Sequence, residues 1–341
     1  MRGGGFVESW ADRRRSGALL LKASLHSRRP LKILNVGTES AGNPLGSRMR
    51  FFQPPTPVGT SALRIQLCYL WRHRRLARLG RPRLLTEWVQ HRKLHDRDPR
   101  LPLMADKVQA KDEVARLLGT SWIIPTLWHG DMLPAVPAWR FPYVVKSRHG
   151  SQHVQIVRND ADHRVAVARS RTWMKQPYGA WLDEWLYDRI PRGILVEPFI
   201  GTSRALPVDY KLFVFGGSVS FIQVHLDRAN NHRWIVMDRQ WRRTSKATLD
   251  ADPPQPESLQ KMIAAAERLG VGTAFVRADF YEVDGQPLFG ELTFYPGSGL
   301  DKVEPLRLDL KMGKLWAAAL AGGKSPACAI SFGAKRGGDR R

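Results

Sequence analysis

Hydrophobic and polar positions alternate in a regular way from residue 101 onward. The spacing of the apolar residues predicts helices over residues 107–118, 173–187 and 256–269, and short strands over 122–128, 143–146 and 194–200. Gly119 and Gly270 follow the first and last of these helices, as is usual at a helix C-terminus.

Two β-hairpins are expected in the C-terminal half. They pair strand 210–215 with 219–226, and strand 274–282 with 286–294. Gly216-Gly217 and Asp284-Gly285 supply residues that tolerate the positive φ of tight turns. Because strands first alternate with helices and then pair with each other, the pattern indicates a mixed α/β or α+β fold and not a purely parallel sheet.

The second hairpin carries four polar residues in otherwise apolar strands: Arg277, Asp279, Glu291 and Thr293. Side chains alternate between the two faces of a strand, so the turn decides which of them meet. A loop of two residues would put the acids on opposite faces. A loop of three, residues 283–285 with a glycine bulge, puts Arg277 opposite Glu291. We predict the three-residue loop and a joint polar face.

Two carboxylates on one face repel each other unless a cation lies between them. Mg²⁺ is commonly held by one or two carboxylates together with phosphate oxygens, so Asp279 and Glu291 are candidate ligands. The alternative is a solvated hairpin in which Arg277 pairs with an acid. The backbone amides of residues 296–299 follow directly and are suited to facing an anion or to forming a simple turn.

Further polar residues lie at strand ends or inside strands upstream. They are, in chain order, Lys146 before a loop that contains Gly150 and Ser151, then Glu197, and then Asp209 and Lys211 on one strand face. A lysine at a strand end can reach a phosphate over which a small-residue loop closes. Taken alone, each of these residues could equally be an ordinary charge on the protein surface. Their order along the chain is what indicates a function.

That order resembles the order of motifs in the ATP-grasp superfamily, and the sequences of the segments are similar to those of its TupA-like branch, the teichuronopeptide-biosynthesis proteins. The resemblance covers about residues 84–318. Its matching stretches are residues 88–99, 105–107, 145–151, 209–217, 221–224 and 290–299, of which the last three are the most specific.

The resemblance implies an α+β, ATP-grasp fold in which two lobes, about 141–200 and about 201–325, grip ATP. For the nucleotide, it assigns phosphate contacts to Lys107 and Lys146, the mobile loop to Gly150 and Ser151, the adenine-binding edge to Val196 and Glu197, a further contact to Lys211 and the ribose to Asp209. It assigns Mg²⁺ to Asp279, Glu291 and Thr293, and stabilisation of the transferred phosphoryl group to Arg277. Thr293 stands where many ATP-grasp enzymes have Asn, and Arg148 and Gln152 also depart from the usual loop.

The implied activity is an ATP- and Mg²⁺-dependent ligation of a carboxylate to an amine through an acyl phosphate, in the synthesis of a cell-surface polysaccharide or peptide polymer. Phosphoryl transfer of this kind needs positioning and charge stabilisation, which lysines, an arginine and a metal ion supply. Three alternatives stay open. They are a glycosyltransferase of polysaccharide synthesis, a basic nucleic-acid-binding protein, and an ATP-grasp-like protein without turnover.

Charge is concentrated at the two ends of the chain. The sequence has 54 basic and 31 acidic residues, and 21 of the basic but only 6 of the acidic ones lie in residues 1–100. We expect a disordered basic segment over 1–60, a basic helical segment over 61–100, a catalytic body over 101–325 and a basic tail over 326–341. Residues 61–83 are suited to an anionic membrane surface or, equally, to packing as a helix with a solvated arginine face.

The cysteine content and the lack of a long apolar run narrow the class of protein further. Two cysteines in 341 residues exclude a disulfide scaffold and a cysteine-rich zinc site. The chain has neither an apolar run of about 18 residues nor a clear secretory signal, so we expect a cytoplasmic protein that is peripheral to a membrane at most. Met49 is an alternative start to Met1.

Overall fold

The computed structural model describes residues 58–202, 206–227, 232–248 and 251–322. Every described residue belongs to one compact unit, which begins at Pro55. The predicted disordered segment, apart from its last residues, and the predicted basic tail lie outside the described residues. No helix in the described part of the chain is both long and apolar enough to cross a bilayer.

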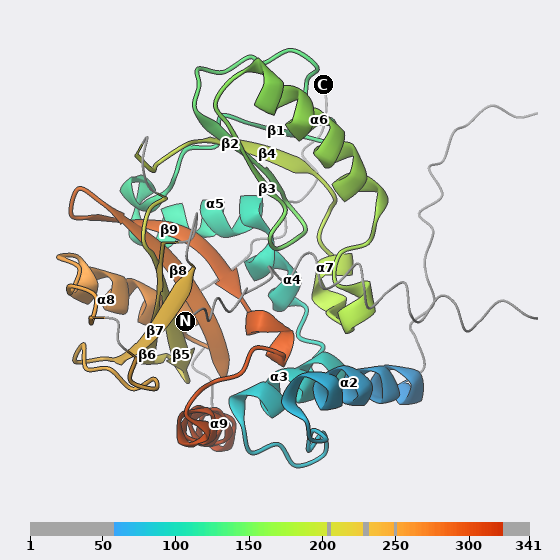
Figure 1. The fold of residues 1–341 in the computed structure, drawn as a ribbon, viewed down its shortest axis with the longest axis vertical. Coiled ribbons are helices and arrows are strands. Elements are labelled where there is room, and N and C mark those ends of the chain that lie inside the picture. Colours follow the sequence, from blue (N-terminus) through green and yellow to red (C-terminus); the bar gives the residue numbers. More distant parts are fainter. Residues whose placement is uncertain (1–57, 203–205, 228–231, 249–250, 323–341) are drawn as a thin grey trace, which may run out of the picture. The chain divides into compact units, whose positions relative to one another are not determined.

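Two antiparallel sheets form the framework (Figure 1). The smaller sheet has the strand order β1-β4-β2-β3, with β1 at Trp128–Gly130, β2 at Tyr143–Ser147, β3 at Val154–Val157 and β4 at Ile194–Pro198. The larger has the order β7-β6-β5-β8-β9, with β5 at Asp209–Phe215, β6 at Ser218–Leu226, β7 at Arg233–Asp238, β8 at Phe275–Val283 and β9 at Gln286–Thr293. The predicted α+β fold is therefore confirmed.

Helices cover both sheets. They are α2 at Val58–His73, α3 at Leu85–His95, α4 at Arg100–Ala105, α5 at Lys107–Leu118, α6 at Asp160–Lys175, α7 at Trp185–Asp188, α8 at Leu259–Gly270 and α9 at Leu306–Ala321, with 3-10 turns at Thr120–Trp122, Ala180–Leu182 and Pro296–Gly299. Helix α6 packs on β2 and β3, α8 packs on β5, β6 and β8, and α3 lies against α9 (Figure 1).

The two faces of the larger sheet have different roles. Leu212, Val214 and Ala278 are fully buried on one face, and α8 covers it: Gly270 at the end of α8 lies so close to Val214 that a Cβ there would be 2.5 Å from its Cγ1. On the opposite face the ring of Phe275 stacks on Trp316 of α9, with centroids 4.3 Å apart. Because side chains alternate, the polar residues of β5 and β8 lie on this second face, beyond the aromatic packing.

The turn between β8 and β9 has two residues, so the predicted three-residue loop is wrong. Asp284 and Gly285 both have positive φ, 51° and 70°, and Val283 pairs with Gln286. A bulge at Gly290 then shifts the register, so that Asp279 pairs with Glu291. The joint polar face that we predicted therefore exists, but a bulge creates it and not the length of the turn.

Other predicted elements differ in extent. The run at 122–128 forms a strand only from Trp128, where β1 begins. The helix predicted over 173–187 instead ends at Lys175, ahead of Pro177, and begins at Asp160, where the Asn159 side chain accepts a hydrogen bond from the Asp162 N–H. The basic helical segment is divided into α2 and α3 by residues 74–84. The strands β3 and β7 and the helix α9 were not expected.

Candidate functional site

Asp279 is the centre of a cluster of charges on the larger sheet. Arg277 donates two hydrogen bonds of 2.7 Å to its two carboxylate oxygens, and the Lys211 ammonium is 2.6 Å from Oδ2. Strand pairing explains the contact, because β5 and β8 bring Lys211 directly opposite Asp279. Asp279 is only 2% exposed, and a buried carboxylate of this kind requires such partners.

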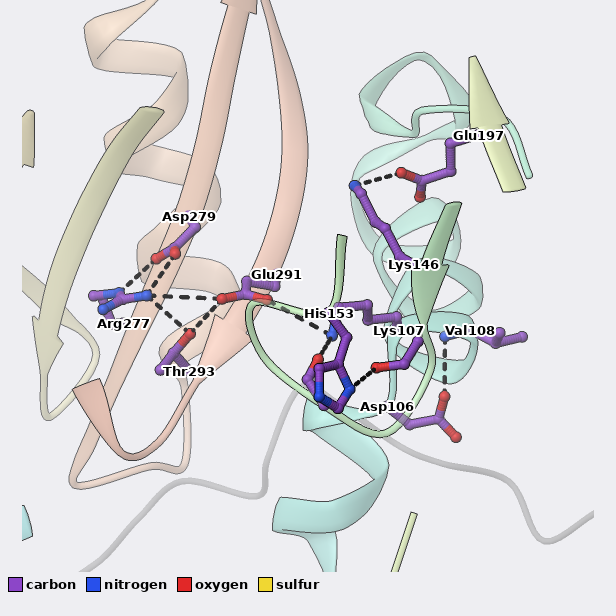
Figure 2. A network of polar contacts seen from close by, with 12 residues as sticks. Asp106, Lys107, Val108, Lys146, His153, Glu197, Arg277, Asp279, Glu291 and Thr293 are labelled. Carbon is purple, nitrogen blue, oxygen red and sulfur yellow. Dashed lines mark hydrogen bonds and ion pairs between the residues drawn. The ribbon is translucent and has the colours of Figure 1, made fainter. Parts of the chain in front are cut away.

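Glu291 and Thr293 reach the same cluster from β9 (Figure 2). Arg277 Nη2 lies 3.7 Å from Glu291 Oε1 and donates to Thr293 Oγ1 over 3.1 Å. The Thr293 hydroxyl donates to Glu291 Oε1 over 3.0 Å. The guanidinium of Arg277 thus contacts both acids, which therefore converge on one cation.

Lys107 approaches from the first turn of α5, on the other side of Glu291 (Figure 2). Its ammonium lies 3.9 Å from Glu291 Oε2 and donates a hydrogen bond to the backbone carbonyl of Gly150. The preceding residue, Asp106, caps the helix by accepting from the Val108 N–H, and it also binds Arg148 at 2.7 and 2.6 Å. Lys107 therefore joins the loop after β2 to the cluster on β9.

Lys146 and Glu197 form a second ion pair, at 2.5 Å, between neighbouring strands of the smaller sheet. Lys111 of α5 binds the other oxygen of Glu197 and donates to the Ile124 carbonyl over 2.7 Å. We did not predict a role for Lys111. Its spacing of four residues from Lys107 on one helix is the signal that would have identified it, since such residues share a face.

Burial and nearby charge shift the acid pKa values in opposite directions. Burial opposes ionisation of Glu291, but the cations of Lys107, Lys211 and Arg277 outweigh it and lower its pKa to about 2. At Asp279 burial is the largest effect, and it raises the pKa above its usual value although Arg277 and Lys211 oppose it. Glu291 therefore carries a full negative charge at neutral pH.

The lysine pKa values also diverge. Burial lowers the pKa of Lys107, and the carboxylate of Glu291 compensates only in part. At Lys211 burial is outweighed by Asp209 and Asp279, which raise the pKa. Lys211 is thus held as a cation, whereas the charged form of Lys107 would be stabilised by a bound polyanion.

The remaining predicted residues occupy varied environments. Asp209 is 2.7 Å from the Lys211 ammonium, and Gly150 and Ser151 lie in the loop after β2. A Cβ on Gly150 would lie within 3.0 Å of three neighbouring side chains, so the packing there requires glycine. Val196 differs from expectation: its side chain is fully buried, and its strand β4 lies between β1 and β2, so it has no open edge.

The donor set fits a magnesium ion that is shared with a ligand. Among the described residues no three His, Cys, Asp or Glu side chains form a metal-binding group. Asp279 and Glu291 nevertheless face each other across β8 and β9, and the Thr293 hydroxyl adjoins Glu291. Two carboxylates and a hydroxyl are oxygen donors of the kind Mg²⁺ prefers, and its remaining ligands are usually phosphate oxygens and water.

A turn held in an unusual conformation follows β9. Gly297, Ser298 and Gly299 have φ values of 52°, 57° and 66°, a left-handed run that is unfavourable at the serine. Gln90 Nε2 donates to the Ser298 carbonyl over 2.8 Å. Lys93 Nζ donates to the same carbonyl over 2.9 Å and lies 2.6 Å from Ser298 Oγ. We call these two residues of α3, Gln90 and Lys93, the turn clamp. They were not predicted, because no signal in the local sequence distinguishes a buried polar residue from the exposed ones of the same helix.

A hollow adjoins Arg277 on the same sheet face. The Pro296–Gly299 turn borders it, and α3 and α9 contribute apolar side chains. Its polar lining includes Gln223 of β6, Lys302 and the acids Asp301 and Glu304, and Trp234 of β7 adds an aromatic ring. Gln223 pairs with Lys211 across β5 and β6, so the hollow continues the row of polar residues that begins at Glu291.

A comparison with models of protein families finds one match that covers most of the chain. The family model described as TupA-like ATPgrasp matches residues 87–317. Solved structures with a similar fold include D-alanine–D-alanine ligase from Bacillus anthracis (15% identity, 64% of this chain and 66% of that chain, TM-score 0.40) and the ATP-grasp ligase PsnB with a minimal precursor (11%, 66% and 62%, 0.40). The chain thus spans slightly less than two thirds of those structures. No curated protein matches it significantly.

Proposed function

Since the chain belongs to the TupA-like ATP-grasp family, which confirms the predicted resemblance, we propose that it is an ATP-dependent ligase that joins a carboxylate to an amine. The observation that carries this proposal is that Asp279 and Glu291 both contact Arg277. Lys211 forms an ion pair with Asp279, and Lys107 with Glu291. Five charged groups from three strands and a helix suit a triphosphate and its counter-ion.

Lysines from both sheets and from α5 would bind the nucleotide. Lys107 and Lys146 are the phosphate contacts, and their present partners, Gly150 and Glu197, would share them with ATP. The loop with Gly150 and Ser151 would then close over the phosphates. Lys211, held as a cation by Asp209 and Asp279, would contact the nucleotide from the larger sheet.

Asp279, Glu291 and Thr293 would hold Mg²⁺. When bound, the ion would neutralise charge on the phosphate oxygens and hold them in line for transfer. Arg277 would give up part of its contact with the two acids and stabilise the transferred phosphoryl group instead. A cation would remain beside the two acids throughout that exchange, because Mg²⁺ would replace the part of the contact that Arg277 gives up.

The reaction proceeds in two displacements. An oxygen of the acceptor carboxylate attacks the γ-phosphorus of ATP, the bond to the bridging oxygen breaks, and ADP leaves. The amine nitrogen then attacks the carbonyl carbon of the acyl phosphate, inorganic phosphate leaves, and the nitrogen loses a proton to give the amide. Arg277 and Lys211 position the phosphoryl oxygens in the first step.

The acceptor carboxylate would lie in the hollow beside Arg277. Gln223 supplies a hydrogen-bonding amide there, Lys302 supplies a positive charge and Trp234 a flat apolar surface. Pockets that combine an apolar wall with a few placed polar groups are typical of small-molecule sites. We propose a cytoplasmic role in the synthesis of a cell-surface polysaccharide or peptide polymer, whose sugar acids or amino acids would supply the two substrates.

The first test is production of ADP from ATP and Mg²⁺ over pairs of carboxylates and amines, including sugar acids and amino acids. Asp279→Asn and Glu291→Gln are expected to lower the rate by about 100-fold or more, as loss of a key transition-state contact does. The exposed acids Asp112 and Glu257 supply the matched controls Asp112→Asn and Glu257→Gln, which are expected to retain the wild-type rate. Equal rates in all four variants would contradict the proposed site.

Binding separates a wrong site from a missing substrate. Mg²⁺ and ATP together are expected to raise the free energy of unfolding of the wild-type chain by RT ln(1 + [L]/Kd), which raises the melting temperature by several degrees when the ligands are in large excess over Kd. Absence of that shift would refute the nucleotide site itself. Consumption of a nucleotide sugar without ATP would favour the glycosyltransferase alternative.

A further inference from the structure

Helix α2 presents a row of large apolar side chains outward. Leu63, Leu67, Leu70 and Trp71 are 62, 57, 42 and 56% exposed. Their spacing of four, three and one residues places them on a single face of the helix. We call these four residues the outer stripe of α2. An apolar row of this length is unusual on a helix whose opposite face is already buried.

The inner face fixes the orientation of α2. Ile65 and Tyr69 are buried, and the Tyr69 hydroxyl lies 2.9 Å from Thr86 Oγ1 in α3. Arg64 donates to Asp183 over 2.8 Å, and Arg72 Nε donates to the Leu300 carbonyl over 2.9 Å. The helix is therefore held on both sides by side-chain contacts, and the outer stripe is not free to turn inward.

The charge around the stripe has one sign. Residues 58–86 contain seven arginines and neither Asp nor Glu. Arg74, Arg78, Arg81 and Arg83 are exposed, in the segment that follows α2, and Leu76 among them is also 60% exposed. A partner must therefore accept bulky apolar groups and offer negative charge close beside them.

We propose that the outer stripe of α2 and the arginines of residues 74–83 dock on the surface of an anionic phospholipid membrane. Leu63, Leu67 and Leu70 would enter the acyl boundary, Trp71 would lie at the headgroup level, and the arginines would contact lipid phosphates. Nucleic acid would explain the arginines but not the row of leucines. The proposal does not depend on the proposed reaction, since docking requires neither ATP nor substrate.

Vesicle sedimentation of the full chain tests the proposal. Vesicles of phosphatidylcholine with phosphatidylserine are expected to bind the wild-type chain, and Leu67→Ser with Trp71→Ser is expected to weaken binding about tenfold or more because two apolar anchors are lost. A double variant of equally exposed residues elsewhere, Val165→Ser with Leu320→Ser, is the control and is expected to bind as the wild type does.

Several results would overturn the proposal. Equal binding by the two double variants would assign membrane affinity to the other basic parts of the chain, and equal binding to pure phosphatidylcholine would exclude an anionic surface. A lower melting temperature for Leu67→Ser with Trp71→Ser than for the control would show that the stripe is covered within the chain. A change in oligomeric state in that variant would show instead that a second copy covers it.

Discussion

Arg277 illustrates how a single side chain can hold two acids in position for the metal ion that we propose. It contacts Asp279 over 2.7 Å and Glu291 over 3.7 Å. Without a cation between them, two buried carboxylates on facing strands would repel, and one would take up a proton. The guanidinium favours the ionised form of both acids and holds them in line with each other. The site therefore needs little rearrangement before a divalent ion replaces part of that contact.

Asp309 is a second buried acid, and it sets a pH dependence of stability. It is 3% exposed and accepts hydrogen bonds from the backbone N–H and the hydroxyl of Thr86, so it joins α9 to α3. Burial raises its pKa from 3.8 to about 6. Between these values the folded protein holds a proton that the unfolded chain lacks, so the free energy of unfolding decreases as pH rises.

The variant Asp309→Asn tests this pH dependence, because its amide side chain does not titrate. Relative to that variant, the wild-type free energy of unfolding is expected to fall by about 2.4 kcal/mol from pH 4 to pH 7, with a slope of at most about 1.4 kcal/mol per pH unit. Urea unfolding at a series of pH values measures the difference. The exposed Asp112→Asn serves as control, and a difference between wild type and Asp309→Asn that does not change with pH would contradict the prediction.

At the scale of elements, the turn clamp joins α3 to the Pro296–Gly299 turn. Lys93 is 3% exposed, and its ammonium is held by Ser298. Burial lowers its pKa to about 8. The clamp stabilises a left-handed backbone conformation that would otherwise be costly. Since the turn borders the hollow beside Arg277, its shape would decide how an acceptor in the proposed site meets the phosphoryl group.

Lys93→Met removes one half of the clamp. We expect the free energy of unfolding to fall by about 2 kcal/mol, because a charged donor to a buried hydroxyl is lost. We also expect ADP production to fall by about tenfold or more, because a displaced positioning group misaligns the reactants. Lys261→Met on the exposed side of α8 is the control. Lower stability with unchanged turnover would show that the clamp supports only the fold.

Local patterns in the sequence predicted α5, β2 and the hairpin strands well, because alternation and a glycine stop are local signals. They did not predict the register of β8 and β9. The turn at Asp284-Gly285 was compatible with two loop lengths, and the bulge at Gly290 depends on close backbone contact: a Cβ there would lie 3.1 Å from the Asp279 carbonyl. The predicted joint polar face was correct, but the predicted pairing of Arg277 with Glu291 was wrong, because Arg277 pairs with Thr293 and Asp279 with Glu291.

The contacts between distant segments were the part that sequence alone could not supply. Lys93 and Ser298 are 205 residues apart, and Lys111 and Glu197 are 86 apart. Each of these polar residues resembles a surface residue in its own segment. Only the packing of α3 and α5 on the sheets turns them into buried partners, so the turn clamp and the role of Lys111 became visible in three dimensions.

At the scale of the whole described unit, Lys107 connects the two sheets. It lies on α5, binds the Gly150 carbonyl in the loop after β2 of the smaller sheet, and approaches Glu291 on β9 of the larger sheet (Figure 2). A triphosphate that enters between them would meet an ammonium already shared by the loop and an acid. We therefore expect nucleotide binding to order the loop through this lysine.

Hydrogen exchange of the loop amides tests that coupling. In the wild-type chain, Mg²⁺ and ATP are expected to slow exchange over residues 148–154, because the loop gains a second set of bonds to the phosphates. In Lys107→Met most of that protection is expected to vanish, and the Kd for ATP is expected to rise about tenfold to 100-fold, as loss of a charged hydrogen bond predicts. Lys261→Met should behave as the wild type does. If Lys107→Met binds ATP weakly but still protects the loop at saturation, closure is driven by the phosphates directly and Lys107 contributes only to affinity.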